Sequence, residues 1–155
     1  MILAVSDTGP LIHLDEIDSL DLLSTVDELL IPQTVFDELD AGGLPPGLIE
    51  LEYEIVEAES EPLAVELDPG ETAAIAIASE RSAVLLTDDL EAREAATDHD
   101  IEVHGSIGII VLAYSHGELD KTEAAERMRS LQAETSLFIT DAVVEKGISL
   151  LENSS

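Results

Sequence analysis

The sequence has no cysteine and no tryptophan. The absence of cysteine excludes disulfides, thiolate metal sites and cysteine nucleophiles together. Aromatic residues make up only 3% of the 155 residues, so the core has to be built from Leu, Ile, Val and Ala. No apolar run approaches the roughly 20 residues of a membrane helix, and no basic segment of a signal peptide opens the chain. We expect a cytoplasmic protein with a single domain over residues 1–151 and a frayed tail over 152–155.

Positive charge is scarce as well. Six Lys and Arg stand against 35 Asp and Glu, which gives a formal net charge of −29. The acids are scattered and hydrophobic residues make up an ordinary 45%, so the acids are expected to coat a folded surface rather than to mark disorder. Molar salt screens such a surface to within about 3 Å. The simplest interpretation is a salt-adapted protein of a halophile, with a nucleic-acid mimic or an acidic binding module as alternatives. No basic patch argues for nucleic-acid binding.

Short apolar segments alternate with helical patterns along the chain. Strands are predicted at residues 2–6, 28–31, 53–56, 83–87 and 101–104, with a further short one at 137–139. Helices are predicted from residue 10 to about 23, and at 32–41, 68–82, 88–97, 106–116, 121–132 and 140–151. Residues 44–47 are expected to form a loop, and 57–67 are the least certain connection. The alternation favours an α/β protein, with a three-layer α/β/α fold around a central, mostly parallel sheet.

Acidic residues stand where the ligands of such a sheet bind, beyond the carboxyl ends of its strands. Asp7 follows the first predicted strand, and Asp88 and Asp89 follow the strand at 83–87. Two further acids lie on helices beside apolar faces. Glu38 flanks one such face, and Glu71 heads a stripe with the i, i+3, i+4, i+7 spacing of a buried helix surface.

Each of these acids also has a purely structural explanation. Asp7 can fix the turn before Gly9, and Glu38 can be an ordinary solvated helix residue. Glu71 can belong to a helix-initiating box in which Asp68 is the N-cap. Asp88 can cap the helix that follows it. These roles are compatible with function, because a helix N-terminus can orient a carboxylate that also binds a metal.

Taken together, four segments resemble the PIN-domain ribonucleases, in the order of that family. They are VSDTGPLI at 5–12, IPQTVFDEL at 31–39, DPGETAAI at 68–75 and LLTDDLEAR at 85–93. The segment HGSIG at 104–108 resembles the helix opening of one subfamily, which shares the Asp-x-Gly-Glu and Asp-Asp-x-x-x-Arg forms seen here. The resemblance covers nearly the whole chain. It implies an α/β/α fold and divalent-metal-dependent cleavage of RNA, and many such proteins are the toxin of a toxin–antitoxin pair.

The resemblance also implies a set of site residues. The residues carried over as catalytic and as metal ligands are the same four acids, Asp7, Glu38, Glu71 and Asp88. The auxiliary positions are Asp89, Thr8, Arg93 and Ser106. Arg93 follows Asp89 by four residues on one helix, so a surface ion pair is the alternative to a phosphate contact at the rim of the site. Ser106 lies near a place where some members keep another acid, which leaves a four-acid site.

The chemistry of this residue set favours Mg²⁺ or Mn²⁺ as cofactor, because carboxylate oxygens are the ligands those ions prefer. The four histidines, His13, His99, His104 and His116, show no zinc-ligand spacing, and structural or surface roles are expected for them. RNA is the expected substrate, an antitoxin protein a candidate partner and a homodimer the expected assembly, with no membrane association.

Two other classes of protein remain open. An α/β phosphatase or receiver-type domain also gathers acids at strand ends. Against the receiver, Lys121 and Lys146 lie in predicted helices rather than at a strand end, and against the phosphatase, Gly9 stands where a second Asp is needed. A catalytically inactive PIN-like interaction module is the alternative from a different class.

Overall fold

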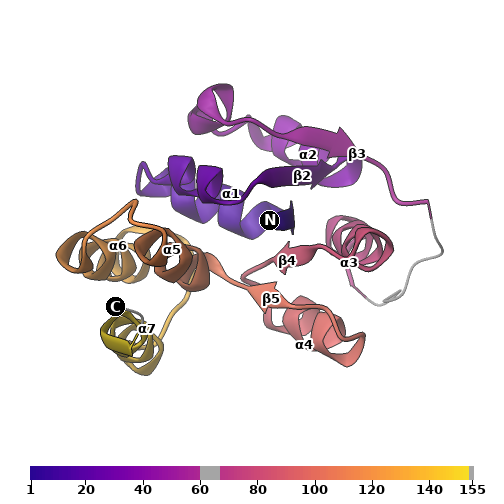
Figure 1. Ribbon diagram of the computed structural model, residues 1–155. Helices are drawn as coiled ribbons and strands as arrows, with labels where there is room; N and C mark the ends of the chain where they lie inside the picture. The colour runs from indigo at the N-terminus through magenta and orange to yellow at the C-terminus, as the bar shows by residue number, and fades with distance from the viewer. Residues whose placement is uncertain (60–66, 154–155) are drawn as a thin grey trace.

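The computed structural model describes residues 1–59 and 67–153. Within these ranges five strands form one sheet in the order β3-β2-β1-β4-β5, and every neighbouring pair is parallel (Figure 1). The strands are β1 (Leu3–Ser6), β2 (Glu28–Pro32), β3 (Glu54–Val56), β4 (Val84–Leu86) and β5 (Val103–His104). The predicted α/β fold with a parallel sheet is confirmed.

Helices connect the strands and cover both faces of the sheet. The α-helices are α1 (Thr8–Glu16), α2 (Gln33–Gly42), α3 (Pro69–Arg81), α4 (Leu90–Asp98), α5 (Ser106–Ser115), α6 (Lys121–Glu134) and α7 (Asp141–Asn153). Two short 3₁₀ helices, η1 (Leu20–Thr25) and η2 (Pro46–Glu50), lie in the connections. In Figure 1 the helices α3 and α4 lie together beside one part of the sheet, and α5, α6 and α7 gather at the other.

The core is split in two because successive residues of a strand face opposite sides. Ala4 packs in a cluster with side chains of α1, α5 and α6, whereas Val5 packs with side chains of α3 and α4. Leu86 and Leu85 divide between the same two clusters. Both clusters are almost wholly aliphatic, as the composition requires. Burial on both faces is the normal environment of a parallel sheet.

Several predicted boundaries are wrong. The helix expected to run to about Leu23 ends at Glu16, because the chain turns through Asp18 in a left-handed conformation with φ 52°. The predicted strand at 137–139 does not form, and the predicted loop at 44–47 runs into η2. The helix after β4 begins at Leu90, and its N-cap is Asp89 rather than Asp88.

Two regions of the chain are described only in part. Helix α7 extends to Asn153, so the predicted tail at 152–155 begins with helical residues, and 154–155 lie outside the described part of the chain. Of the uncertain connection at 57–67, residues 60–66 lie outside it as well.

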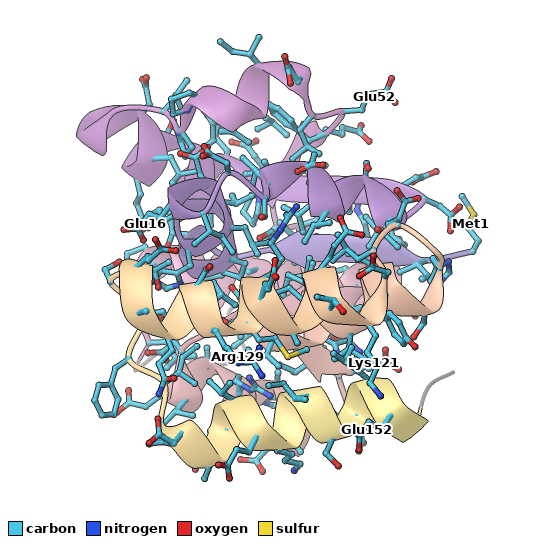
Figure 2. All side chains as sticks on the ribbon, turned by 90° about the vertical axis from the view of Figure 1, so that its left-hand side faces the viewer. Met1, Glu16, Glu52, Lys121, Arg129 and Glu152 are labelled. Atoms are coloured by element: carbon cyan, nitrogen blue, oxygen red, sulfur yellow. The ribbon has the colours of Figure 1, made fainter. Side chains whose placement is uncertain are left out.

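Carboxylates dominate the surface, as the charge predicts. Figure 2 looks onto α6 and α7, where oxygen-tipped side chains far outnumber nitrogen-tipped ones. One of the few cations there, Lys121, lies 3.6 Å from a carboxylate oxygen of Glu152. Among the described residues, no helix has the length and apolar character needed to span a bilayer.

Candidate functional site

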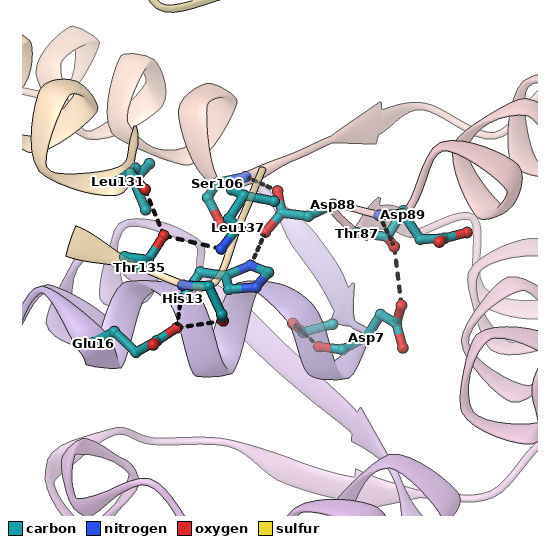
Figure 3. Close-up of polar contacts among 12 residues, drawn as sticks. Asp7, His13, Glu16, Thr87, Asp88, Asp89, Ser106, Leu131, Thr135 and Leu137 are labelled. Atoms are coloured by element: carbon teal, nitrogen blue, oxygen red, sulfur yellow. Dashed lines mark hydrogen bonds and ion pairs between the residues drawn. The ribbon is translucent and has the colours of Figure 1, made fainter. Parts of the chain in front are cut away.

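The strand order reverses between β1 and β4, and in open α/β sheets ligands bind at the carboxyl end of such a switch point. Asp7 follows β1 at this point, and its backbone N–H donates to the carbonyl of Leu86 on β4 at 2.9 Å. The side chain of Asp7 is buried, and its Oδ2 accepts a 3.0 Å hydrogen bond from the hydroxyl of Thr87 (Figure 3). Its Oδ1 is buried without a hydrogen-bond partner among the described residues. Such an orphaned carboxylate oxygen is costly unless something binds it.

The electrostatic environment of Asp7 opposes ionisation. Burial raises the pKa of the Asp7 carboxyl, and the nearby charges of Asp68 and Asp89 raise it further. The N–H of Thr8 and the hydroxyl of Thr87 act in the opposite direction. A nearby cation would favour the ionised form and so offset both the desolvation cost and the repulsion.

Glu38 reaches the same region from α2, across a close contact between α2 and α3. A Cβ added to Gly70 would come within 2.8 Å of one Glu38 carboxylate oxygen and 2.9 Å of the other, so a larger residue there would displace the Glu38 carboxylate. The backbone N–H of Gly70 bonds to the Glu38 carboxylate, which lowers its pKa. Partial burial and the charges of Asp68 and Asp7 outweigh this bond, and the net effect is a raised pKa.

Glu71 stands in the first turn of α3. Asp68 is the N-cap of this helix and accepts from the N–H of Glu71 at 2.8 Å, while Pro69 occupies the first helical position. The capping role predicted for Asp68 is therefore present. Burial raises the pKa of Glu71 to about 8, helped by its hydrogen bond with Asp68 and by the charges of Asp68, Asp7 and Asp89.

The side chain of Asp88 is bound by residues of α1 and α5, whereas that of its neighbour Asp89 caps α4. Its Oδ1 accepts from the backbone N–H of Ser106 at 2.6 Å, and its Oδ2 from the Ser106 hydroxyl at 2.6 Å. Nδ1 of His13 also lies 2.8 Å from Oδ2 (Figure 3). The side chain is only 8% exposed. Asp88 thus joins the end of β4 to α1 and to the first turn of α5, and both of its oxygens are engaged.

Asp89 lies close enough to Asp7 and Glu71 for its charge to act on both. Its Oδ2 caps α4 by accepting from the N–H of Ala92 at 2.9 Å, and its own N–H donates to the Thr87 hydroxyl at 3.2 Å. The one hydroxyl of Thr87 therefore bonds to both Asp7 and Asp89. The charge of Asp89 contributes to the raised pKa of Asp7 and of Glu71. The acids that influence one another electrostatically are Asp7, Glu38, Asp68, Glu71 and Asp89, called here the acidic cluster.

The remaining auxiliary positions lie around this cluster. Thr8 opens α1 and, with Glu38, lines a groove of about 470 Å³ beside the cluster. The backbone N–H and the hydroxyl of Ser106 both donate to the Asp88 carboxylate. The predicted ion pair between Arg93 and Asp89 is absent from the described part of the chain, and the Arg93 guanidinium lies against Gly105 instead.

Sequence reasoning missed four contributors to this site. The contact of His13 with Asp88 agrees with the structural role expected for this histidine, but no local pattern predicts a partner 75 positions away. Thr87 and Gly70 lay inside quoted motifs without a role of their own. Asp68 was identified only as a cap, although its charge acts on three of the cluster's carboxyls.

The donors of the acidic cluster determine whether a divalent metal ion fits this site. In residues 1–59 and 67–153 no three carboxylate or imidazole groups already enclose one ion position. The chemistry of the acidic cluster nevertheless fits a hard cation. Its donors are all oxygens, one of them is buried and orphaned, and three carboxyls have pKa values raised by burial and mutual repulsion.

Comparison with known proteins defines the class. A family model for the PIN domain matches residues 3–153, so this chain belongs to the PIN domain family. Members of this family are typically nucleases and usually use divalent metals. The chain also resembles the structure of a PilT N-terminus domain protein from the hyperthermophilic archaeon Sulfolobus solfataricus P2. The TM-score is 0.60 at 20% identity, over 76% of this chain and 96% of that one, which shows the shared fold. No curated protein matches the chain.

Proposed function

We propose that this PIN domain is a divalent-metal-dependent endoribonuclease whose centre is the acidic cluster. The observation that carries the proposal is Asp7, a buried carboxylate with one oxygen tied to Thr87 and the other without a partner, surrounded by acids that raise its pKa. A fold gains nothing in stability from such an arrangement. It is the arrangement expected where a bound cation completes the site.

The residues proposed to hold Mg²⁺ or Mn²⁺ are Asp7, Glu38 and Glu71. Asp89 is favoured as the fourth acid over Asp88, because the oxygens of Asp88 are engaged by His13 and Ser106. When bound, the metal would polarise a phosphate oxygen of the RNA and lower the pKa of a water molecule. The protein orients the site: Thr87 fixes the rotation of the Asp7 carboxylate, and the N–H of Gly70 holds that of Glu38.

The biological setting is proposed on the family resemblance alone. A toxin role with an antitoxin protein as partner, a homodimeric assembly and a cytoplasmic location all belong to this part of the proposal. Adaptation to high salt is proposed from the net charge of −29.

Cleavage of single-stranded RNA in about 2 M KCl tests the function directly. We expect cleavage with Mn²⁺ or Mg²⁺ and none after exhaustive EDTA treatment, because the cluster offers no other electrophile. Asp7→Asn should abolish cleavage, whereas Asp98→Asn, an equal charge change at the far end of α4, should cleave like the wild type. Activity that survives EDTA would contradict a metal nuclease. A folded wild type that binds metal but cleaves no RNA would favour the inactive interaction module.

A further inference from the structure

Arg93 stands at the rim of the acidic cluster, one turn into α4. A Cβ added to Gly105 would lie 2.7 Å from Nη1 of Arg93 and 2.8 Å from Oδ1 of Asp88. The guanidinium therefore rests over the bare backbone of Gly105, immediately before α5. Arg93 itself is exposed to solvent, so a ligand can reach it.

The acids nearest to Arg93 are already engaged. Asp88 accepts three hydrogen bonds from His13 and Ser106, and Asp89 caps α4 through its Oδ2. In the described part of the chain no carboxylate lies within 4.0 Å of the guanidinium. Among residues 1–59 and 67–153 the planar set of donors of Arg93 thus has no carboxylate partner, although the sequence holds 35 acids.

Other cations of the chain are used or placed elsewhere. Arg127 donates to the buried hydroxyl of Ser19, and Lys121 pairs with Glu152. Arg81 ends α3, about 18 Å from the first residue of that helix at a rise of about 1.5 Å per residue. Of these four residues, Arg93 is the one whose guanidinium lies beside Asp88, and it stands one turn after Asp89 on α4.

An acidic nuclease has to hold a polyanion against its own charge. At molar salt the Debye length is about 3 Å, so both long-range repulsion by the surface and long-range attraction to any cation are screened. Only groups in direct contact with the RNA then contribute to binding. A guanidinium is suited to this task, because its fork of N–H donors matches two phosphate oxygens at once.

We propose that Arg93 binds a backbone phosphate of the RNA next to the acidic cluster, with Gly105 leaving the space in which its guanidinium lies. The inference rests on the proposed ribonuclease function. Arg93 acts on the substrate and not through the metal, so its loss should weaken RNA binding and leave the metal site intact.

Steady-state cleavage of a labelled single-stranded RNA with Mn²⁺ in about 2 M KCl tests this contact, together with calorimetric Mn²⁺ binding in the absence of RNA. Arg93→Gln should raise KM about tenfold, with little change in kcat and none in Mn²⁺ affinity, because a contact made equally in substrate and transition state is lost. Arg93→Lys should recover part of the loss, since it keeps the charge without the fork. Arg81→Gln, an equal charge change away from the site, should match the wild type.

Two results would overturn the inference while leaving the nuclease function in place. One is a cleaving wild type whose KM is unchanged by Arg93→Gln. The other is a fall in Mn²⁺ affinity that parallels the rise in KM, which would place the effect of Arg93 on the acids. A wild type that fails to cleave RNA with Mn²⁺ would refute the proposed function, and the phosphate contact with it.

Discussion

The backbone of Gly70 lies so close to the carboxylate of Glu38 that a single added methyl group would come within 2.8 Å of it. Gly70 is in the first turn of α3, and its N–H bonds to the carboxylate it adjoins. The glycine of the Asp-x-Gly-Glu motif thus has a physical explanation. With no side chain, Gly70 lets Glu38 of α2 approach the N-terminus of α3.

Gly70→Ala should displace Glu38 without unfolding the protein. Alanine is intrinsically favoured over glycine in a helix by about 1 kcal/mol. The clash with Glu38 offsets this gain, so the free energy of unfolding should change little. Mn²⁺ affinity, measured by calorimetry, should fall about tenfold or more as one ligand is displaced. Gly42→Ala, at the end of α2 with no atom near its added methyl, should bind Mn²⁺ like the wild type. Equal Mn²⁺ affinity in the two variants would remove Glu38 from the site.

The adjacent acids Asp88 and Asp89 should separate in a matched pair of substitutions. Asn retains helix capping, so Asp89→Asn should melt close to the wild type but bind Mn²⁺ about tenfold or more weakly. Asp88→Asn should change Mn²⁺ affinity little and cost about 1 kcal/mol of stability, through weaker bonds to His13 and Ser106. Thermal unfolding and calorimetry measure the two effects. The opposite pattern of Mn²⁺ affinities would make Asp88 the fourth ligand, as the family resemblance implies.

Glu71 should make metal binding and stability depend on pH in opposite senses. Its pKa is about 8 in the folded protein against an ordinary value of 4.5, so the folded metal-free protein retains a proton that the unfolded chain loses. The stabilisation from this proton is fully present below about pH 4.5 and disappears as the pH rises to about 8. Metal binding requires the carboxylate, so Mn²⁺ affinity should rise over the same interval, by up to about tenfold per pH unit.

Glu71→Gln is the control for this behaviour, because the amide of glutamine has no carboxyl proton to lose. Its metal-free stability should decline less between about pH 5 and 8 than that of the wild type, as followed by thermal unfolding. A wild-type stability that rises through this interval would show that the carboxyls of the cluster are not protonated in the folded state.

Salt should stabilise the fold. Repulsion among 35 acids has to be screened, and the Debye length falls from about 10 Å at 0.1 M to about 3 Å at 1 M. The melting temperature should therefore rise between about 0.1 M and about 2 M KCl, and NaCl should act similarly because screening follows ionic strength. Equal melting temperatures at the two KCl concentrations would contradict the adaptation to high salt.

The sequence was sufficient to predict the fold class and the general location of the site. Alternating apolar strands and helices indicated the parallel sheet, and the cap at Asp68 followed from the residues around it. The direction of Asp88 could not be predicted, because it depends on whether α4 begins at residue 88 or 90. A shift of that size exchanges the capping acid and points two adjacent carboxylates in different directions.

The contacts that shape the site are long-range, and for that reason local patterns did not reveal them. His13 lies on α1, which follows β1, and Asp88 follows β4. The two residues therefore meet only after β1 has paired with β4. Glu38 meets Gly70 only where α2 and α3 touch. The break of the first predicted helix at Asp18 likewise depends on a single left-handed residue with no glycine to signal it.

The most direct test of this account is a calorimetric titration of Mn²⁺ into the metal-free protein at about 2 M KCl, with the wild type, Asp7→Asn and Asp98→Asn compared at the same pH. If the orphaned Oδ1 of Asp7 is the centre of a metal site, the wild type and Asp98→Asn bind Mn²⁺ alike and Asp7→Asn binds it at least about tenfold more weakly. A wild type that takes up no Mn²⁺, or an Asp7→Asn variant that binds it as tightly as the wild type, would contradict the central claim.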